Sequence, residues 1–214
     1  EQSGADIREV SKAIGADTRI GEKFLNAWPG FGGSCFQKDI LNLVYICNHY
    51  GLNEVASYWE KVIDINVWQQ KRISSLIVEK LFGTLSGKKI SILGFAFKAN
   101  TNDTRESPSI KICRELLEEG ANLAIYDPRV SKKQIASDLQ REDVLNNNLT
   151  TEGSWSFCKS IKDSALNSDA ILILTEWAEF QEVNWKDISN IMRKPSWIFD
   201  TRSIANLNEA KESG

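Results

Sequence analysis

With 214 residues, the chain is long enough to bury a hydrophobic core without disulfides or structural metals, and it has room for one or two domains. Its 26 Lys and Arg residues against 29 Asp and Glu give a formal net charge of -3, which argues against nucleic acid or an anionic membrane as a partner. No apolar run reaches the roughly 20 residues of a membrane span, and the first residues lack the basic start and apolar stretch of a signal peptide, so we expect a cytoplasmic protein.

The first predicted elements are helices on either side of a loop rich in glycine and aromatic residues. In the first helix the apolar residues follow the i, i+3, i+4 spacing: Ile7, Val10, Ala13 and Ile14. Gly15 is placed to end this helix, and the glycine- and aromatic-rich segment covers residues 16–37. Helical spacing resumes over about residues 39–50, where Gly51 stands as a C-cap.

Residues 53–82 contain no Gly or Pro, which predicts one continuous helix of roughly 40 Å. Its apolar stripe is interrupted in the middle by Asn66 and Gln69. The apolar members of this stripe are Val55, Trp59, Val62, Ile73 and Leu76. A helix of this length is typical of a spine between domains or of a dimer interface, and we expect a homodimer or a higher oligomer built on dimers.

After residue 84 the pattern changes to alternating strands and helices. Apolar runs of strand length occupy residues 89–97, 121–128, 169–177 and 196–201, and helical patterns occupy residues 107–120 and 184–194. This alternation predicts the α/β class: a helical dimerisation domain (1–84) with a long central helix, then a Rossmann-like parallel-sheet domain (85–214). The polar segment 143–154 is predicted to be an exposed loop.

Ligands of an open parallel sheet bind beyond the carboxyl ends of its strands. After the first predicted strand the sequence reads "GFAFKANTNDTRES", in which only Gly94 remains of the glycines that would hold a dinucleotide pyrophosphate. Lys98 and Arg105 in this segment are cations suited to a phosphate or an anionic cofactor, or they belong to an ordinary solvated loop.

The stretch "GFGGSCFQKD" presents a candidate nucleophile, Cys35. A position just before a helix start, with Lys38 nearby, favours the reactive thiolate. Gly32 and Gly33 remove side chains from the approach, and Asp39 supplies a carboxylate that could activate water, or it is only a helix N-cap. A buried structural thiol is the alternative for Cys35. The four cysteines are widely spaced without a CxxC pair, so we expect free thiols and no metal.

Several of these stretches together resemble the UDP-glucose 6-dehydrogenase family, from near its middle to near its C-terminus. They are "GFGGSCFQKD", the long helix, "ILGFAFKANTNDTRESPS", "IYDP" and "LTEW". The residues "FQKD" are similar to the UDP-glucose branch rather than to the GDP-mannose or UDP-hexosamine branches. The resemblance implies oxidation of UDP-glucose to UDP-glucuronate with two NAD per turnover, and it implies a dimer.

The resemblance also implies roles for individual residues. Cys35 would carry the sugar as a thiohemiacetal and then as a thioester, which water hydrolyses with help from Asp39. Arg105 would face the cofactor. Substrate-binding residues would be Arg19, Phe31, Gly32, Phe36, Phe97, Lys98 and Arg202, with Arg19 reaching the substrate of the partner subunit. Without the resemblance, Arg19 could be an ordinary surface cation, and Phe31 and Phe36 could be core aromatics.

The sequence begins without Met, inside a predicted helix, and the NAD-binding domain of the family precedes the portion that the chain resembles. We therefore expect a fragment that does not turn over alone. The alternatives are a GDP-mannose or UDP-hexosamine dehydrogenase of the same family, or a non-catalytic module for nucleotide-sugar binding or dimerisation.

Overall fold

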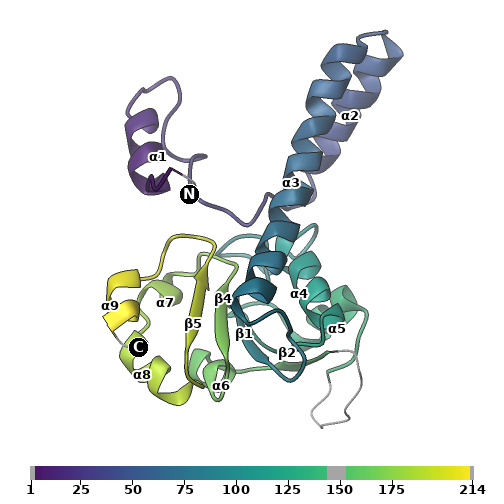
Figure 1. Ribbon diagram of the computed structural model, residues 1–214. Helices are drawn as coiled ribbons and strands as arrows, with labels where there is room; N and C mark the ends of the chain where they lie inside the picture. Colours follow the sequence, from purple (N-terminus) through teal and green to yellow (C-terminus); the bar gives the residue numbers. More distant parts are fainter. Residues whose placement is uncertain (1–2, 144–152, 213–214) are drawn as a thin grey trace.

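The computed structural model describes residues 3–143 and 153–212. Its helical part comprises α1 (Ile7–Gly15), α2 (Phe36–His49) and α3 (Asn53–Lys80). Figure 1 shows α2 and α3 as a hairpin that projects from the rest of the molecule, whereas α1 lies apart from that hairpin. The predicted long helix is confirmed, because α3 is continuous over 28 residues.

The second part of the chain is built on one sheet of five parallel strands in the order β3-β2-β1-β4-β5. The strands are β1 (Lys89–Leu93), β2 (Asn122–Tyr126), β3 (Ser154–Phe157), β4 (Ala170–Ile173) and β5 (Trp197–Asp200). The helices are α4 (Pro108–Glu118), α5 (Lys132–Leu139), α6 (Ile161–Ala165), α7 (Ala178–Gln181), α8 (Trp185–Ile191) and α9 (Leu207–Glu212). This strand order is that of dinucleotide-binding doubly wound sheets, so the predicted Rossmann-like α/β fold is confirmed.

The hydrophobic core is formed by the strands of the sheet and the helices that pack against them, and it includes the last turns of α3. The central strands read as apolar runs because helices cover both faces of a parallel sheet. β1 pairs with β2 and β4 so that Leu93, Tyr126 and Ile173 end side by side, which brings the three carboxyl ends together. From α3, Ile73 and Ile77 belong to the same buried cluster as the sheet. The long helix therefore joins the α2–α3 hairpin to the sheet core.

The buried stripe of α3 differs from the predicted one. Val55 and Leu76 are exposed, and the residues that are buried on this helix are Ala56, Asn66, Gln70, Ile73, Ser74 and Ile77. The helix has no single apolar seam because its neighbours change along its length. Its N-terminal half contacts α2, and its last turns contact α4 and the sheet core.

Three predicted boundaries are corrected. Helix α2 begins at Phe36, which places Asp39 in its first turn, so Asp39 is not the N-cap. Strand β1 ends at Leu93 because Gly94 turns the chain with φ +93°. The predicted exposed loop 143–154 is wrong at both ends, since the side chain of Asp143 is 2% exposed and pairs with Lys132, and Ser154 lies in β3. Residues 144–152 lie outside the described residues.

Over the ranges that the structure describes, no helix is both long and apolar enough to cross a membrane. The four cysteines are free, as predicted, and of these only Cys35 is exposed. No group of acidic, cysteine or histidine side chains within the described ranges has the arrangement of a metal site.

Candidate functional site

The site is formed by two loops, which we name the cysteine loop (residues 28–35) and the β1 loop (residues 94–107). The main chain of Gly33 donates a hydrogen bond to the carbonyl oxygen of Arg105 over 2.9 Å. A Cβ atom on Gly32 would lie 2.4 Å from the carbonyl oxygen of Glu106, and no side chain fits there. Gly32 and Gly33 therefore allow the backbone of the cysteine loop to lie directly on the β1 loop.

Cys35 occupies the N-cap position of α2, with its side chain exposed. Its carbonyl oxygen accepts the first helical hydrogen bond, from the N–H of Asp39 over 2.8 Å. Its sulfur lies 3.8 Å from the hydroxyl oxygen of Ser34. Asp39 is exposed one turn further along, on the same face of the helix as Cys35.

Arg105 places a positive charge near this thiol. Its guanidinium forms a two-pronged contact with Asp103, with Nε 3.0 Å from Oδ1 and a terminal nitrogen 2.7 Å from Oδ2. These hydrogen bonds raise the pKa of Arg105, and the charge of Cys35 adds a smaller contribution in the same direction. Arg105 and Cys35 thus lie within electrostatic reach of each other.

Aromatic rings flank Cys35. Phe31 and Phe36 meet edge to face with their ring centroids 4.8 Å apart, and Phe36 is 53% exposed, so it is not a core aromatic. From the β1 loop, the ring of Phe97 packs on Gly33, 3.1 Å from the position of a Cβ atom. The Nζ atom of Lys98 lies 5.3 Å from the centroid of the Phe97 ring and is exposed. The structure thus brings these predicted residues together.

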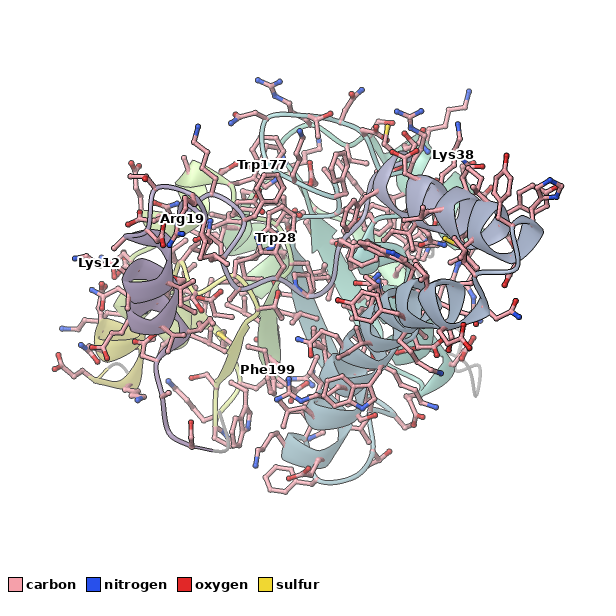
Figure 2. All side chains as sticks on the ribbon, turned by 90° about the horizontal axis from the view of Figure 1, so that it is seen from above. Lys12, Arg19, Trp28, Lys38, Trp177 and Phe199 are labelled. Carbon is pink, nitrogen blue, oxygen red and sulfur yellow. The ribbon has the colours of Figure 1, made fainter. Side chains whose placement is uncertain are left out.

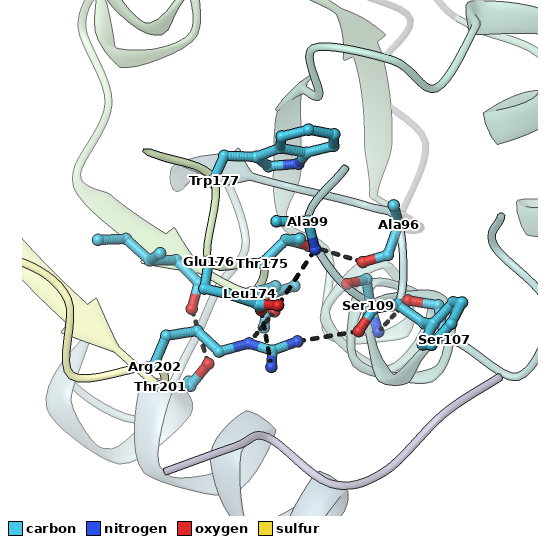
Figure 3. A network of polar contacts seen from close by, with 12 residues as sticks. Ala96, Ala99, Ser107, Ser109, Leu174, Thr175, Glu176, Trp177, Thr201 and Arg202 are labelled. Atoms are coloured by element: carbon cyan, nitrogen blue, oxygen red, sulfur yellow. Dashed lines mark hydrogen bonds and ion pairs between the residues drawn. The ribbon is translucent and has the colours of Figure 1, made fainter. Parts of the chain in front are cut away.

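Arg202 joins the same group from the end of β5, but its side chain is 2% exposed (Figure 3). It donates to the carbonyl oxygens of Leu174 over 2.7 Å and of Phe97 over 3.1 Å. It also lies 2.9 Å from the Glu176 carboxylate and packs 4.3 Å from the centroid of the Trp28 ring. Burial lowers the pKa of Arg202 to about 10, although Glu176 opposes this shift. Arg202 therefore ties the β1 loop to the cysteine loop.

Arg19 does not join this group within one chain. Its side chain is 87% exposed and pairs with Asp17. Figure 2 shows Arg19 and Lys38 on opposite sides of the molecule, with Trp28 between them. Arg19 is therefore accessible from outside the chain that carries it.

At the carboxyl ends of the strands, the acidic group that could bind a cofactor is hydrogen-bonded to the protein itself. In dinucleotide-binding folds an acidic residue after the second strand hydrogen-bonds the cofactor ribose. Here Asp127 takes that place, but its carboxylate is 3% exposed and accepts five N–H groups of this chain. The donors are the main chains of Phe95, Ala96, Arg129 and Val130 and the ring of Trp177. A Cβ atom at Gly94 would lie 2.4 Å from Thr175, so the β1 loop packs directly on the end of β4, and Asp127 has no free oxygen for a ribose.

A cavity of about 910 Å³ opens beside the cysteine loop, between α2, α3 and α4. Its walls include four cations and two carboxylates: Lys38, Arg105, Lys111, Arg114, Glu106 and Asp138. Gln70 and Thr104 also line it, and they are 7% and 4% exposed. In the described part of the chain, no hydrogen bond reaches the side chain of either residue, and neither is among the buried polar atoms that lack a partner. An amide and a hydroxyl on the wall of the cavity can hydrogen-bond a polar ligand there.

Sequence reasoning missed Gln70 and Thr104. For Gln70 the one signal is the polar interruption of the α3 stripe, where the predicted stripe has Gln69 instead. No pattern in the sequence marks Thr104. Sequence reasoning also missed Trp28 and Glu176, since only the fold brings them to Arg202.

Comparisons with known proteins agree with this geometry. Residues 91–207 match the sequence pattern of the "UDP-glucose/GDP-mannose dehydrogenase family, UDP binding domain", and residues 1–68 match its "central domain". The chain is 49% identical to the UDP-glucose 6-dehydrogenase of Drosophila melanogaster, over 100% of this chain and 45% of that protein. It is 47% identical to UDP-glucose 6-dehydrogenase 4 of Arabidopsis thaliana, over 100% of this chain and 46% of that protein.

A solved structure is similar over nearly the whole chain. It is a UDP-glucose dehydrogenase from the hyperthermophilic archaeon Pyrobaculum islandicum, with a TM-score of 0.77 and 28% sequence identity. The similarity covers 99% of this chain and 43% of that structure. The chain therefore spans less than half the length of each of these relatives.

Proposed function

The chain belongs to the UDP-glucose/GDP-mannose dehydrogenase family, and from this premise we propose that it supplies the nucleophile and the substrate-binding part of an NAD-dependent UDP-glucose 6-dehydrogenase. The observation that carries the proposal is the exposed Cys35, at a helix start within reach of Arg105 and joined through Phe97 to Lys98 and Arg202. The relatives named above are UDP-glucose 6-dehydrogenases, which favours UDP-glucose over other sugar nucleotides.

Cys35 performs covalent catalysis in this proposal. After the C6 alcohol has been oxidised to an aldehyde, the thiolate forms a C–S bond to the carbonyl carbon, and the oxygen takes up a proton to give a thiohemiacetal. Loss of hydride and a proton leaves a thioester on Cys35. Water then adds to the thioester, the C–S bond breaks, and the acid leaves while the thiol is regenerated. The Asp39 carboxylate, one turn along α2, accepts the proton of that water.

A nicotinamide cofactor, when bound, is the two-electron acceptor of both oxidations. The 910 Å³ cavity beside the cysteine loop offers only part of a site for such a cofactor. Lys38 and Arg105 would attract its negative charge, and the side chains of Gln70 and Thr104 would hydrogen-bond its polar groups. The glycine cradle of a dinucleotide site is not encoded in these residues, so we propose that turnover requires a separate dinucleotide-binding domain.

Lys98 is the proposed phosphate contact, and its replacement by Ala should weaken UDP-glucose binding about tenfold or more. The lost charge-assisted contact is worth roughly 1.5 to 3 kcal/mol. The matched control is Lys88→Ala, because Lys88 also lies over a phenylalanine ring, 5.8 Å from Phe82, but before the amino end of β1. Calorimetric titration of the 214-residue chain measures both variants.

The same titration tests the cofactor proposal. UDP and UDP-glucose are expected to bind this chain, and NAD is expected to show no measurable affinity. Binding of NAD with a defined stoichiometry, or binding of UDP-glucose that is equal in Lys98→Ala and Lys88→Ala, would contradict the assignment of the site. Turnover of the full-length enzyme with UDP-glucose, GDP-mannose and UDP-hexosamines distinguishes the branches of the family. If none of these substrates is turned over, the non-catalytic module is favoured.

A dimer through the outer face of the α2–α3 hairpin is also proposed. Ile65 and Trp68 are 63% and 58% exposed, and large apolar residues on a helix face of this kind favour a partner surface. We expect Ile65→Glu to shift the protein toward monomer in light scattering at micromolar concentration. Lys133→Glu, which changes one exposed charge on α5, should leave the mass unchanged. A wild-type protein that is only monomeric under these conditions would exclude a self-sufficient interface.

A further inference from the structure

We propose that Asn66, in the middle of α3, is a positioning residue that holds the cysteine loop in the geometry that Cys35 needs. The proposal rests on the function proposed above. Asn66 is 6% exposed, and its side-chain hydrogen bonds within the described residues go to the cysteine loop rather than to the Cys35 side chain. Its Oδ1 accepts a hydrogen bond from the main-chain N–H of Phe31 over 2.8 Å, and its Nδ2 donates to the carbonyl oxygen of Phe31 over 3.2 Å. One side chain thus pairs both polar groups of one loop residue.

The loop is shaped to receive this amide. A buried amide lowers stability unless it is hydrogen-bonded, and the bonds of the Asn66 side chain within the described residues all go to Phe31. The preceding residue, Gly30, has φ +125°, and a Cβ atom there would lie 2.7 Å from Oδ1 of Asn66. The loop backbone reaches the helix surface because residue 30 has no side chain. The contact between the cysteine loop and α3 therefore depends on both Gly30 and Asn66.

The same loop is held on its opposite side by the β1 loop. There, Gly32 touches Glu106, and Gly33 bonds to Arg105. The segment from residue 30 to residue 33 is thus fixed between α3 and the β1 loop, just before Cys35. Within the described residues, the one hydrogen-bond contact of the Cys35 side chain is with Ser34 over 3.8 Å. The position of the thiol therefore depends on the backbone on either side of it, which is the fixed loop segment before it and the first turn of α2 after it.

Helix α3 links this loop to the part of the protein that carries the proposed substrate contacts. Ile73 and Ile77, two and three turns after Asn66, are buried in the sheet core. Lys98 follows β1 of that sheet, and Arg202 follows β5. Asn66 thus fixes the distance between the nucleophile and the bound sugar nucleotide. Its loss should affect the reaction of Cys35 more than the binding of substrate.

The test replaces Asn66 by Leu, which has a similar volume but no polar groups, in the full-length enzyme. We expect kcat to fall about 10- to 100-fold, because small displacements of a reacting group have effects of this size. The KM for UDP-glucose should stay within about twofold of the wild type. The Phe31 amide should exchange with solvent faster, and mass spectrometry should find a changed alkylation rate at the Cys35 peptide. Exchange and alkylation do not depend on turnover, so they test the positioning role even if the proposed function fails.

A second variant guards against simple misfolding. In Asn66→Asp, the protonated carboxyl group can still accept from the N–H of Phe31 and donate to its carbonyl oxygen, whereas the ionised form repels that oxygen. Its kcat relative to wild type should therefore rise as the pH falls through the pKa of the new carboxyl group. If Asn66 only filled space between the loop and α3, this pH dependence would not appear.

The control variant is Ser74→Ala, which removes another buried polar group of α3, one whose hydroxyl has no hydrogen bond in the described chain. It should keep wild-type kcat and wild-type exchange at Phe31. The proposal is overturned by wild-type kcat in Asn66→Leu, by unchanged exchange and alkylation in that variant, or by an equal loss of kcat in Ser74→Ala. A pH-independent ratio of Asn66→Asp to wild type also overturns it.

Discussion

Replacing Cys35 by Ser in the full-length enzyme is expected to lower the formation of UDP-glucuronate on the order of 10³-fold or more. Removal of the nucleophile from a covalent mechanism has effects of this size or larger. A serine hydroxyl near neutral pH is a much poorer nucleophile than a thiolate, and the described site offers no histidine to activate it, since His49 lies at the far end of α2.

Product stoichiometry sharpens this test. With Cys35 present, two NADH should form for each UDP-glucuronate. In Cys35→Ser the first oxidation needs no thiol, so a single turnover should give up to one NADH per active site and no acid. Cys47→Ala is the control, because Cys47 is the buried cysteine of the same helix. Wild-type steady-state turnover in Cys35→Ser, or a loss of similar size in Cys47→Ala, would refute covalent catalysis by Cys35.

The fold was predictable where local patterns dominate. The run without Gly or Pro predicts α3, and the apolar runs predict β1, β2, β4 and β5. Of these, β1, β2 and β4 are the inner strands of the sheet, whereas β5 lies at an edge and was found because its sequence, "WIFD", is apolar. Strand β3 was missed because its residues alternate as "SWSF" at the edge of the sheet, next to a polar segment that favours a loop. The short helices α6 and α7 contain too few residues for periodicity to show them.

For the candidate site, the sequence predicted which segments matter but not how individual side chains are used. The cysteine loop and the β1 loop lie against each other, and both could be identified because glycine-rich loops and strand ends can be recognised in the sequence. The roles of Cys35, Phe97 and Lys98 stay predictions. Whether an individual side chain is buried cannot be recognised from the local sequence in the same way. The resemblance implies a substrate contact for Arg202, yet its side chain is 2% exposed and packs on Trp28, which lies in a distant part of the sequence. Such a contact depends on the whole fold.

The burial of Arg202 leads to a second large expected effect, on stability. Arg202→Met should lower the free energy of unfolding by about 2 to 4 kcal/mol, because the carbonyl oxygens of Leu174 and Phe97 lose a donor and Glu176 loses its ion partner. For a chain of this length the melting temperature should fall by roughly 5 to 12 °C in calorimetry. Arg193→Met is the control. Arg193 forms an ion pair with Asp169 over 3.2 Å, but its side chain is half exposed. Ion pairs at the surface contribute about 0 to 1 kcal/mol to stability.

Binding measurements on the same variants separate two roles of Arg202. If Arg202 only holds the β1 loop, Glu176→Gln should weaken UDP-glucose binding too, because it removes the ion pair with Arg202 over 2.9 Å at the loop that carries Lys98. If Arg202 also touches the sugar nucleotide, Arg202→Met should weaken binding well beyond the effect of Glu176→Gln. Adding Glu176→Gln to Arg202→Met should recover part of the stability, since an unpaired buried charge is removed, but none of the affinity. Equal melting temperatures for Arg202→Met and Arg193→Met would contradict the structural role, because the buried acceptors would then not need their donor.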